Sequence, residues 1–277
     1  MLPATLFSAA ADPATVRARF QLLRPGPRLW AIGAVHGDVP GLVQLHDRLA
    51  EVIGPGDRVV YLGNFLGIGP DPAGVLDEVL DFRCRLMARQ HAFACDVVLL
   101  RGQQEEMWSK LMQLQFAPHP REVLDWLGKS GVKTTLASYG LDYEQGQRAA
   151  RESVTACARW TSIVRAQMSK RPGHREVFSA LKRAALTRDG AMIFVAAGLH
   201  PGKTLDAMSD EFWWGGGLLD RHGGAYGAVK RIVRGYRTNL TIPESDGLVL
   251  SVDGGAGRGG RPMAACLDAA GVLVATI

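Results

Sequence analysis

Leu29-Trp30-Ala31-Ile32-Gly33-Ala34-Val35-His36-Gly37 begins as a short apolar run and ends in a loop. The run predicts a buried β-strand, because a few consecutive apolar residues before a turn signal are typical of a strand inside a sheet. A helix is expected from about Pro40 to Val52, where Leu42, Leu45 and Leu49 share one face. Together these segments predict the strand, loop and helix that open an α/β fold.

The same order of strand, loop and helix continues along the chain. A strand is expected at residues 58–62, followed by a loop rich in Gly and Pro and by a helix from about 73 to 90. The next strand, residues 96–100, ends at Arg101-Gly102. Because α/β folds bind ligands at the carboxyl ends of their strands, the three strand-end loops are expected to form one site.

The remainder of the chain predicts a helical region followed by further strands. Residues 103–186 have a helical pattern, so residues 104–190 are expected to form a helical insertion or cap. Residues 13–23 predict a short helix within a lead-in segment, residues 1–28. No repeat or linker divides the chain, and one compact domain is expected over residues 1–277. Further strands are expected at residues 191–195, 227–233, 248–252, 263–268 and 272–277.

Composition excludes several classes of protein. The formal charge is +5 and the basic residues are spread along the chain, so a nucleic-acid partner is not expected. The densest basic cluster, residues 170–183, has no alternating aromatic residues on which bases could stack, and it is better explained as a solvated helical face. The four cysteines form no Cys-x-x-Cys pair, and no stretch approaches the roughly 20 apolar residues that span a bilayer. We therefore expect a cytoplasmic protein without a membrane partner.

Several strand-end stretches resemble the motifs of calcineurin-like metallophosphoesterases. Gly33 to Gly37 is similar to Gly-Asp-x-His-Gly, residues 63–70 to Gly-Asp-x-x-Asp-Arg-Gly-Pro, and residues 101–105 to Arg-Gly-Asn-His-Glu. Residues 194–199 resemble Phe-Val-His-Ala-Gly-Leu, and residues 235–238 align with Gly-His-Thr-Pro. Residues 126–140 and 251–257 resemble segments of the bacterial serine/threonine-phosphatase-like and dinucleoside-tetraphosphatase-like branch. The resemblance implies an α/β (α+β) fold in which two mixed β-sheets pack as a sandwich flanked by helices.

The family holds two metal ions at six positions, which here carry mostly non-ligating residues. A dinuclear site needs an anionic oxygen between its cations, and imidazoles and an amide oxygen complete the coordination. Of the six residues here, only His36 matches the family pattern, and Asn64 replaces the bridging Asp. No metal or other cofactor is therefore expected. The six positions are Ala34, His36, Asn64, Gln103, Ala196 and Tyr236.

The catalytic positions that the resemblance implies are depleted as well. Gln104 stands where the family has the histidine that protonates the leaving oxygen, and Gly67 where it has the aspartate that orients this histidine. Ile68 replaces the arginine that clamps the phosphate, and Arg101 remains as a cationic group. A glutamine cannot transfer a proton near neutral pH, so no catalytic residue is expected.

Three functions are compatible with these residues. The leading hypothesis is a pseudophosphatase that acts as a regulator or scaffold through another protein. The second is a binding module in which Arg101, Asn64 and His36 hold a phosphorylated ligand or nucleotide without hydrolysis. The third is a divergent phosphoesterase with rebuilt ligands, for which the sequence offers His200, Asp38 and His222 but no new cluster of Asp and His.

Structural explanations compete with functional ones at several of these residues. His36 without its partner ligands is typical of a hydrogen-bonded loop histidine, and Arg101 could pair with Glu105 or Asp96 instead of binding an anion. Trp213-Trp214 predicts core packing, or a partner surface if it is exposed. The glycines at 215–217 and 254–260 match no phosphate-loop pattern and predict turns.

Overall fold

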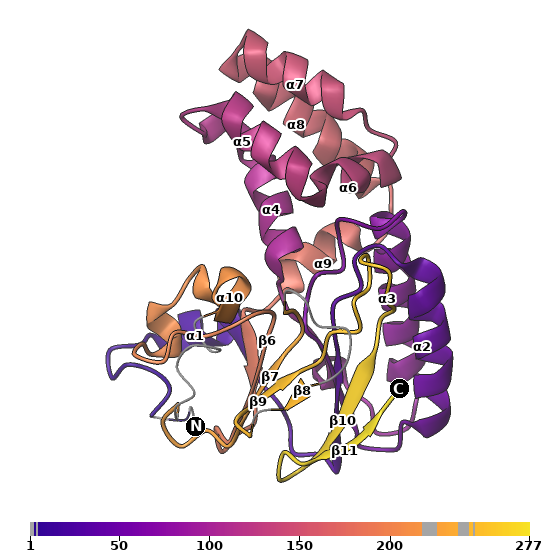
Figure 1. Ribbon diagram of the computed structural model, residues 1–277, viewed down its shortest axis with the longest axis vertical. Coiled ribbons are helices and arrows are strands. Elements are labelled where there is room, and N and C mark those ends of the chain that lie inside the picture. The colour runs from indigo at the N-terminus through magenta and orange to yellow at the C-terminus, as the bar shows by residue number, and fades with distance from the viewer. Residues whose placement is uncertain (1–2, 4, 218–225, 238–243, 246) are drawn as a thin grey trace.

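Two mixed β-sheets form the centre of the molecule. The structure, a computed structural model, describes residues 3, 5–217, 226–237, 244–245 and 247–277. Within this part of the chain, one sheet has the strand order β1-β5-β6-β7-β9-β8 and the other β11-β10-β2-β3-β4. The two sheets face each other, with helices outside them (Figure 1). This arrangement confirms the predicted sandwich of mixed sheets flanked by helices.

The strands are short and mostly buried. The first sheet contains β1 (Phe20–Leu22), β5 (Ala184–Leu186), β6 (Met192–Val195), β7 (Arg231–Arg234), β8 (Glu244–Ser245) and β9 (Val249–Ser251). The second sheet contains β2 (Arg28–Ile32), β3 (Arg58–Tyr61), β4 (Val97–Leu99), β10 (Ala264–Asp268) and β11 (Leu273–Thr276).

Parallel pairing brings the strand-end loops together. In the second sheet β2, β3 and β4 are parallel, with Trp30 opposite Val59 and Val59 opposite Val97, so their carboxyl ends lie at one edge. In the first sheet β6 and β7 are also parallel. The loops of the two sheets then meet, because Ala34 N–H donates to Gly235 O at 3.0 Å.

Apolar side chains fill the space between the two sheets. This inner core is built from alternate residues of the strands, which point away from the covering helices. Burying such side chains is the main favourable contribution to folding, at roughly 25 cal/mol per Å² of apolar surface. Its members include Leu29, Val60, Leu62, Leu100, Phe194, Val233, Leu250 and Leu267.

Helices cover the outer face of each sheet. α2 (Val39–Val52) and α3 (Pro72–Met87) pack on the second sheet, and each begins at an aspartate, Asp38 or Asp71, whose carboxylate accepts a hydrogen bond from a backbone N–H in the first turn. α1 (Pro13–Arg19) and α10 (Glu211–Trp214) lie against the first sheet. The site at the strand ends is thus held between two well-packed layers.

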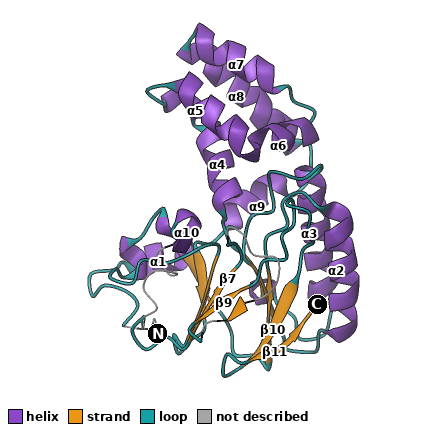
Figure 2. Cartoon of the chain, in the orientation of Figure 1, coloured by secondary structure: helices purple, strands orange, loops and turns teal. Residues whose placement is uncertain are grey.

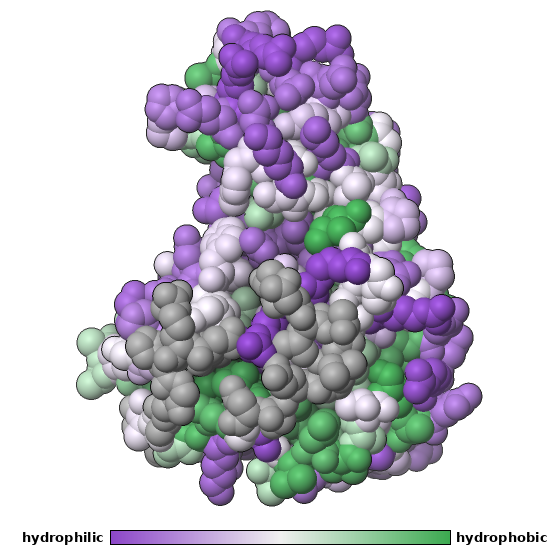
Figure 3. Space-filling model, in the orientation of Figure 1, coloured by the Kyte–Doolittle hydropathy of each residue, from purple (hydrophilic) through white to green (hydrophobic). Residues whose placement is uncertain are grey.

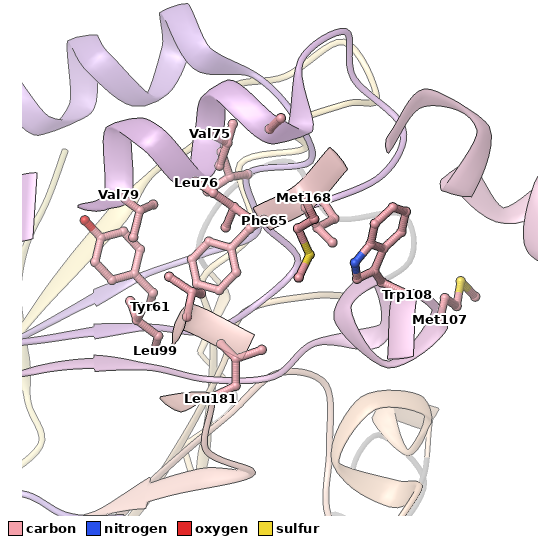
Figure 4. Packing of buried hydrophobic residues seen from close by; sticks show 14 of the residues in the cluster. Tyr61, Phe65, Val75, Leu76, Val79, Leu99, Met107, Trp108, Met168 and Leu181 are labelled. Atoms are coloured by element: carbon pink, nitrogen blue, oxygen red, sulfur yellow. The ribbon is translucent and has the colours of Figure 1, made fainter. Parts of the chain in front are cut away.

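The helices between β4 and β5 rise beyond the sheets as one group, shown in purple at the top of Figure 2. Their outer end is largely hydrophilic (Figure 3). At the base, Trp108 and Met168 join the same apolar cluster as Phe65 and Leu76 of the sheet-and-helix body (Figure 4). The helices are α4 (Gln103–Met112), α5 (Pro120–Leu127), α6 (Lys133–Ser138), α7 (Tyr143–Glu152), α8 (Val154–Ser169) and α9 (His174–Ala180), with a π-helical turn at Gly128–Val132.

The structure corrects some predicted boundaries. Residues 20–22, expected in a helix, form β1, and residues 184–186, expected in the helical insertion, form β5. These two strands pair with each other, with Phe20 opposite Ala184. The partner of β1 lies far away in sequence, so no local pattern signals it, whereas β5 also forms a hairpin with β6. β7 begins at Arg231, later than the predicted start at Gly227.

No helix among the described residues is both long and apolar enough to cross a membrane.

The cysteines are free, with Cys84 and Cys95 exposed and Cys157 and Cys266 buried.

Candidate functional site

Unusual backbone angles shape the loops at the strand ends. His36, Asn64 and Ile68 have φ of 49°, 58° and 58°, in the left-handed region that L-residues seldom adopt. The loops after β2 and β3 are tied together because the N–H groups of Val35 and His36 both donate to Asn64 O, at 3.0 and 2.8 Å. Such strained residues persist only where surrounding contacts hold them.

Glu105 supplies many of those contacts. Its carboxylate is 1% exposed and accepts hydrogen bonds from the N–H groups of Asn64, Phe65, Leu66 and Gly102 at 2.8 to 3.1 Å. Burial raises the pKa of Glu105, although hydrogen bonds from the N–H groups of Leu66, Asn64 and Gly102 act in the opposite direction. Glu105 therefore joins the loop after β3 to the start of α4.

The six family metal-ligand positions lie around this edge, but their atoms do not form a metal site. Ala34 and Ala196 are buried and present only methyl groups. Asn64 is 1% exposed, and its Oδ1 accepts a hydrogen bond from Gln104 N–H at 3.2 Å. Gln103 and Tyr236 both line a cavity beside the site.

His36 is held as a neutral side chain. Its Nδ1 lies 3.2 Å from Leu66 O, which supports the prediction of a hydrogen-bonded loop histidine. Its ring meets Tyr236 edge-on, with centroids 5.8 Å apart. Burial lowers the pKa of His36 to about 4. Its Nε2 has no hydrogen-bond partner among the described residues.

A pair of divalent cations does not fit this set of residues. The site offers one imidazole and neutral amides, and no carboxylate stands where the two ions need an anionic bridge. No three His, Cys, Asp or Glu side chains in the described part of the chain gather into a group that could hold a metal. Asp38 instead caps α2 through Gly41 N–H, and His200 Nδ1 accepts from Gly202 N–H. His222 lies outside the described residues.

Gln104 and Gly67 fit against each other at the catalytic positions. Gln104 is 5% exposed, and its Nε2 donates to Ser130 O at 2.8 Å. A Cβ built on Gly67 would lie 2.1 Å from Gln104 Oε1. Gly67 N–H donates to Thr135 Oγ1 at 3.1 Å, while Ile68 is 38% exposed. The sequence did not predict this support from Ser130 and Thr135, because the contact joins segments far apart in the chain.

Arg101 is engaged with a different carboxylate from those expected. Its guanidinium pairs with Glu106 at 3.0 Å, so the predicted partners Glu105 and Asp96 are wrong. Asp96 pairs with Arg24 and Arg58 at the other end of β4. Of the proposed anion-binding set Arg101, Asn64 and His36, the structure brings Asn64 and His36 into one backbone network and ties the Arg101 side chain to α4.

An ion pair that the sequence did not predict joins buried Asp253 to the more exposed Arg258 beside Tyr236. Asp253 is fully buried and bonds Arg258, and it also accepts from the N–H of Gly255 at 2.9 Å and of Arg237 at 3.1 Å. The Arg258 guanidinium lies 4.9 Å from the centre of the Tyr236 ring. The sequence feature that could have indicated these contacts is the run of glycines after Asp253, because glycines let the chain turn back toward this carboxylate.

A cavity of about 410 Å³ opens beside these residues. It is lined by Gln103, Trp213, Trp214, Tyr236 and Arg237, among others. Trp213 is 4% exposed, as the prediction of core packing requires, whereas Trp214 is only partly buried. Trp214 lies near Trp126 of α5, with ring centroids 6.4 Å apart.

Solved structures share this architecture. No protein-family model matches the chain. No curated protein matches it either. A structure described as a candidate diadenosine tetraphosphatase is 16% identical, with a TM-score of 0.57 over 94% of this chain and 97% of that one. A cold-active protein tyrosine phosphatase from a psychrophilic Shewanella species is 13% identical, with a TM-score of 0.50 over 90% of this chain and 79% of that one. The chain thus has the two-sheet α/β fold of the calcineurin-like metallophosphoesterases.

Proposed function

We propose that this protein is a pseudophosphatase, a phosphoesterase-fold protein that works by binding instead of by metal-dependent hydrolysis. Its role would be regulatory or scaffolding, through a protein partner and in the cytoplasm. The solved neighbours support the phosphatase-like fold, and the residues at the strand ends support the loss of chemistry.

The main observation that supports this proposal is the packing of Gln104 against Gly67. In the family that the motifs resemble, these positions hold the proton donor and the carboxylate that orients it. Here the glutamine side chain occupies the space that a side chain on Gly67 would need, and its amide is fixed by Ser130 O. Asn64 Oδ1 is likewise committed to Gln104 N–H. The replacements form one packed, neutral arrangement in which Gln104 Oε1 is buried without a hydrogen-bond partner among the described residues, and the tight packing supports a non-catalytic site.

The test is a hydrolysis assay with a matched variant. p-Nitrophenyl phosphate and its bis-ester are incubated with the purified protein and Mn²⁺, alongside His36→Asn, which removes the remaining family ligand. We expect the two proteins to give the same background rate. Mn²⁺-dependent turnover that disappears in His36→Asn would contradict the proposal, because it would place a working metal at this site.

A second candidate function is a binding module for a small phosphorylated ligand. The observation that favours it is the cavity of about 410 Å³, which lies within the size range of small-molecule sites and is lined by Gln103 and Tyr236 from the family metal positions.

A further inference from the structure

A groove of about 550 Å³ lies beside β4, the strand that ends the second sheet. α3 and α9 form its walls, with Leu80 of α3 and Val177 of α9 among the apolar side chains. β4 itself is well buried, since Val97 is 7% and Leu99 6% exposed. β11, at the opposite edge of the same sheet, is exposed at every residue. β4 is therefore an edge strand that lies within a groove and not on an open surface.

The outer edge of β4 carries backbone groups that the described residues do not use. Successive residues of a strand direct their N–H and C=O groups to opposite edges, and Leu100 N–H donates to Tyr61 O of β3. The backbone groups of Val97 and Leu99 therefore point away from β3. Leu99 O accepts from Lys182 N–H, but Val97 O and Leu99 N–H have no hydrogen-bond partner among the described residues. Unpaired backbone groups at a well-buried strand cost free energy, and a partner at this edge would remove that cost.

Lys182 shows which kind of partner fits this edge. Its N–H donates to Leu99 O at 2.9 Å, and its O accepts from Arg101 N–H at 2.8 Å. Lys182 thereby pairs with β4 opposite Leu100, in the parallel direction. The chain before it turns away into α9, which ends at Ala180. The pairing stops after one residue, which leaves the first part of β4 without a neighbouring strand on this side in the described part of the chain.

A segment in extended conformation would continue this pairing. One of its residues, placed opposite Val98, would donate to Val97 O and accept from Leu99 N–H. This is the pattern that Lys182 already makes at the end of β4. Addition of a strand to a sheet edge is a recurring mode of peptide recognition, in which backbone hydrogen bonds provide affinity and side-chain pockets provide specificity. The apolar walls of α3 and α9 would contact the side chains of such a segment.

The charges around the groove favour an acidic segment over a basic one. Arg83 and Lys182 line it, and neither forms an ion pair with a carboxylate among the described residues. Arg83 Nη2 donates to Ala94 O at 3.4 Å, and Lys182 Nζ donates to two backbone carbonyls at 2.8 and 3.0 Å. Glu176 is the carboxylate in the described lining, so two cations stand against one anion. Burial also lowers the pKa of Lys182, and a nearby acidic side chain would offset that effect.

We propose that the groove beside β4 binds an extended segment of a partner protein, which adds to β4 as a parallel strand and carries aliphatic and acidic side chains. The aliphatic side chains lie against α3 and α9, and an acidic one lies near Arg83 and Lys182. The groove shares no lining residue with the cavity at the strand ends. This inference rests on the proposed action through a protein partner, but binding here does not depend on the loss of metal chemistry.

The test uses a fluorescein-labelled heptapeptide of alternating valine and glutamate, titrated against the whole chain by fluorescence anisotropy in the presence of EDTA. We expect saturable binding with a Kd of about 100 µM or tighter. The same peptide with lysine in place of glutamate should bind about tenfold more weakly. Two further peptides carry N-methyl groups on one or the other alternate set of amides. Only the set that faces β4 donates to Val97 O, so one of these peptides should lose binding and the other should keep it.

Substitutions in the groove locate the bound peptide. Ala180→Trp fills the groove from the end of α9 and should weaken binding by about tenfold or more. Ser179→Trp, one residue earlier and outside the lining, is the matched control and should bind like the parent protein. Arg83→Gln should weaken binding of the acidic peptide by about threefold, whereas Arg48→Gln, exposed on α2, should not. Far-ultraviolet circular dichroism confirms that each variant keeps its fold.

The exposed cysteines give an independent measurement. Cys95 lines the groove, whereas Cys84 is exposed on α3 outside the lining. At a peptide concentration of about ten times Kd, roughly a tenth of the grooves are free, so alkylation of Cys95 by N-ethylmaleimide should slow by about tenfold. Alkylation of Cys84, followed in the same samples by peptide mapping, should keep its rate.

Several outcomes would overturn the inference. A flat titration would mean that the groove does not take this class of peptide. Equal binding of the two N-methylated peptides would exclude pairing with the β4 edge, and equal or tighter binding of the lysine peptide would exclude the acidic preference. Unchanged affinity in Ala180→Trp, or equal protection of Cys84 and Cys95, would place the peptide on another surface. Because EDTA is present throughout, these failures leave the proposed loss of metal chemistry intact, and a metal-binding result would leave the peptide result intact.

Discussion

Gln104 occupies the space beside Gly67, so that a Cβ on Gly67 would lie 2.1 Å from Gln104 Oε1. Real Cβ atoms essentially never make contacts this short, so one of the two groups would have to move. The two residues stand at positions that the resembled family uses for proton transfer. A side chain at position 67 therefore requires the Gln104 side chain to move.

Gly67→Ala should destabilise the protein by two separable effects. Gly67 has φ of 74°, and an L-residue in this region costs about 1–2 kcal/mol. Crowding against Gln104 adds to that cost, so the free energy of unfolding measured in urea should fall by about 2–4 kcal/mol. Gly140→Ala is the matched control, because Gly140 has φ of 72° and open space around its Cβ position.

The double variant Gly67→Ala/Gln104→Ala separates the two effects. Shortening Gln104 makes room for the new methyl group, so this variant should lose less stability than the sum of its single changes. Simple additivity would show that the two side chains do not compete for space.

Glu105→Gln should be strongly destabilising. Two N–H donors face each carboxylate oxygen of Glu105, and a glutamine would turn an NH₂ group toward one pair. We expect a loss of about 3 kcal/mol or more in the free energy of unfolding, because buried donors would lose their acceptor. Glu106→Gln, next in sequence and partly buried in its ion pair with Arg101, should cost less, at about 1 kcal/mol. Equal effects of the two substitutions would contradict the role given to Glu105.

His36 should make the protein less stable in acid. Its folded pKa of about 4 lies below its ordinary value of 6.5, mainly because of burial. Between these values the unfolded chain binds the proton more readily, so the free energy of unfolding falls as the pH drops through this window. The shift corresponds to about 3 kcal/mol by pH 4.

His36→Asn isolates this contribution. Asparagine tolerates the positive φ of this position and does not titrate, and the other buried histidines are unchanged in the variant. Urea unfolding from pH 7 to pH 4 should therefore show a weaker pH dependence in His36→Asn than in the parent protein. Parallel curves would mean that His36 is not held neutral.

Asp77→Asn should loosen the helices above the sheets. His174 is fully buried, with its Nδ1 2.7 Å from Tyr139 Oη and its Nε2 2.8 Å from Asp77 Oδ1. This chain of hydrogen bonds joins α3 to the segments after α6 and at α9. We expect a loss of about 1 kcal/mol and faster hydrogen exchange in α9. Asp81→Asn on the same helix, where the carboxylate is largely exposed, should change stability by under about 0.5 kcal/mol.

The sequence pattern was sufficient to predict the strands that lead into the site, and the family resemblance implied their arrangement in two sheets. Apolar runs at residues 29–33 and 58–62 marked β2 and β3, because buried parallel strands have no polar face to interrupt the pattern. β1 and β5 were not predictable in the same way. Each is three residues long, β1 pairs with a segment more than 160 residues away, and β5 lies next to a helical pattern although it forms a hairpin with β6.

The candidate site was likewise predictable in part: the positions of its loops could be predicted, but the partners of its side chains could not. The loops that hold His36, Asn64 and Gln104 could be placed together from the order of strands, since parallel strands end at one edge. The partners of these residues could not be predicted, because they depend on side-chain geometry between distant segments. Gln104 meets Ser130 from the turn after α5, and Arg101 turns to Glu106 instead of to Glu105.

The metal content of the protein tests the loss of phosphoesterase chemistry most directly. The protein is purified without chelators or metal-affinity resin, incubated with Mn²⁺, separated from free metal and analysed by elemental mass spectrometry. The donor atoms around His36 and Asn64 predict less than about 0.1 equivalent of bound Mn²⁺ per chain. One or two tightly held equivalents, lost in His36→Asn, would show that these residues do assemble a metal centre and would contradict the account.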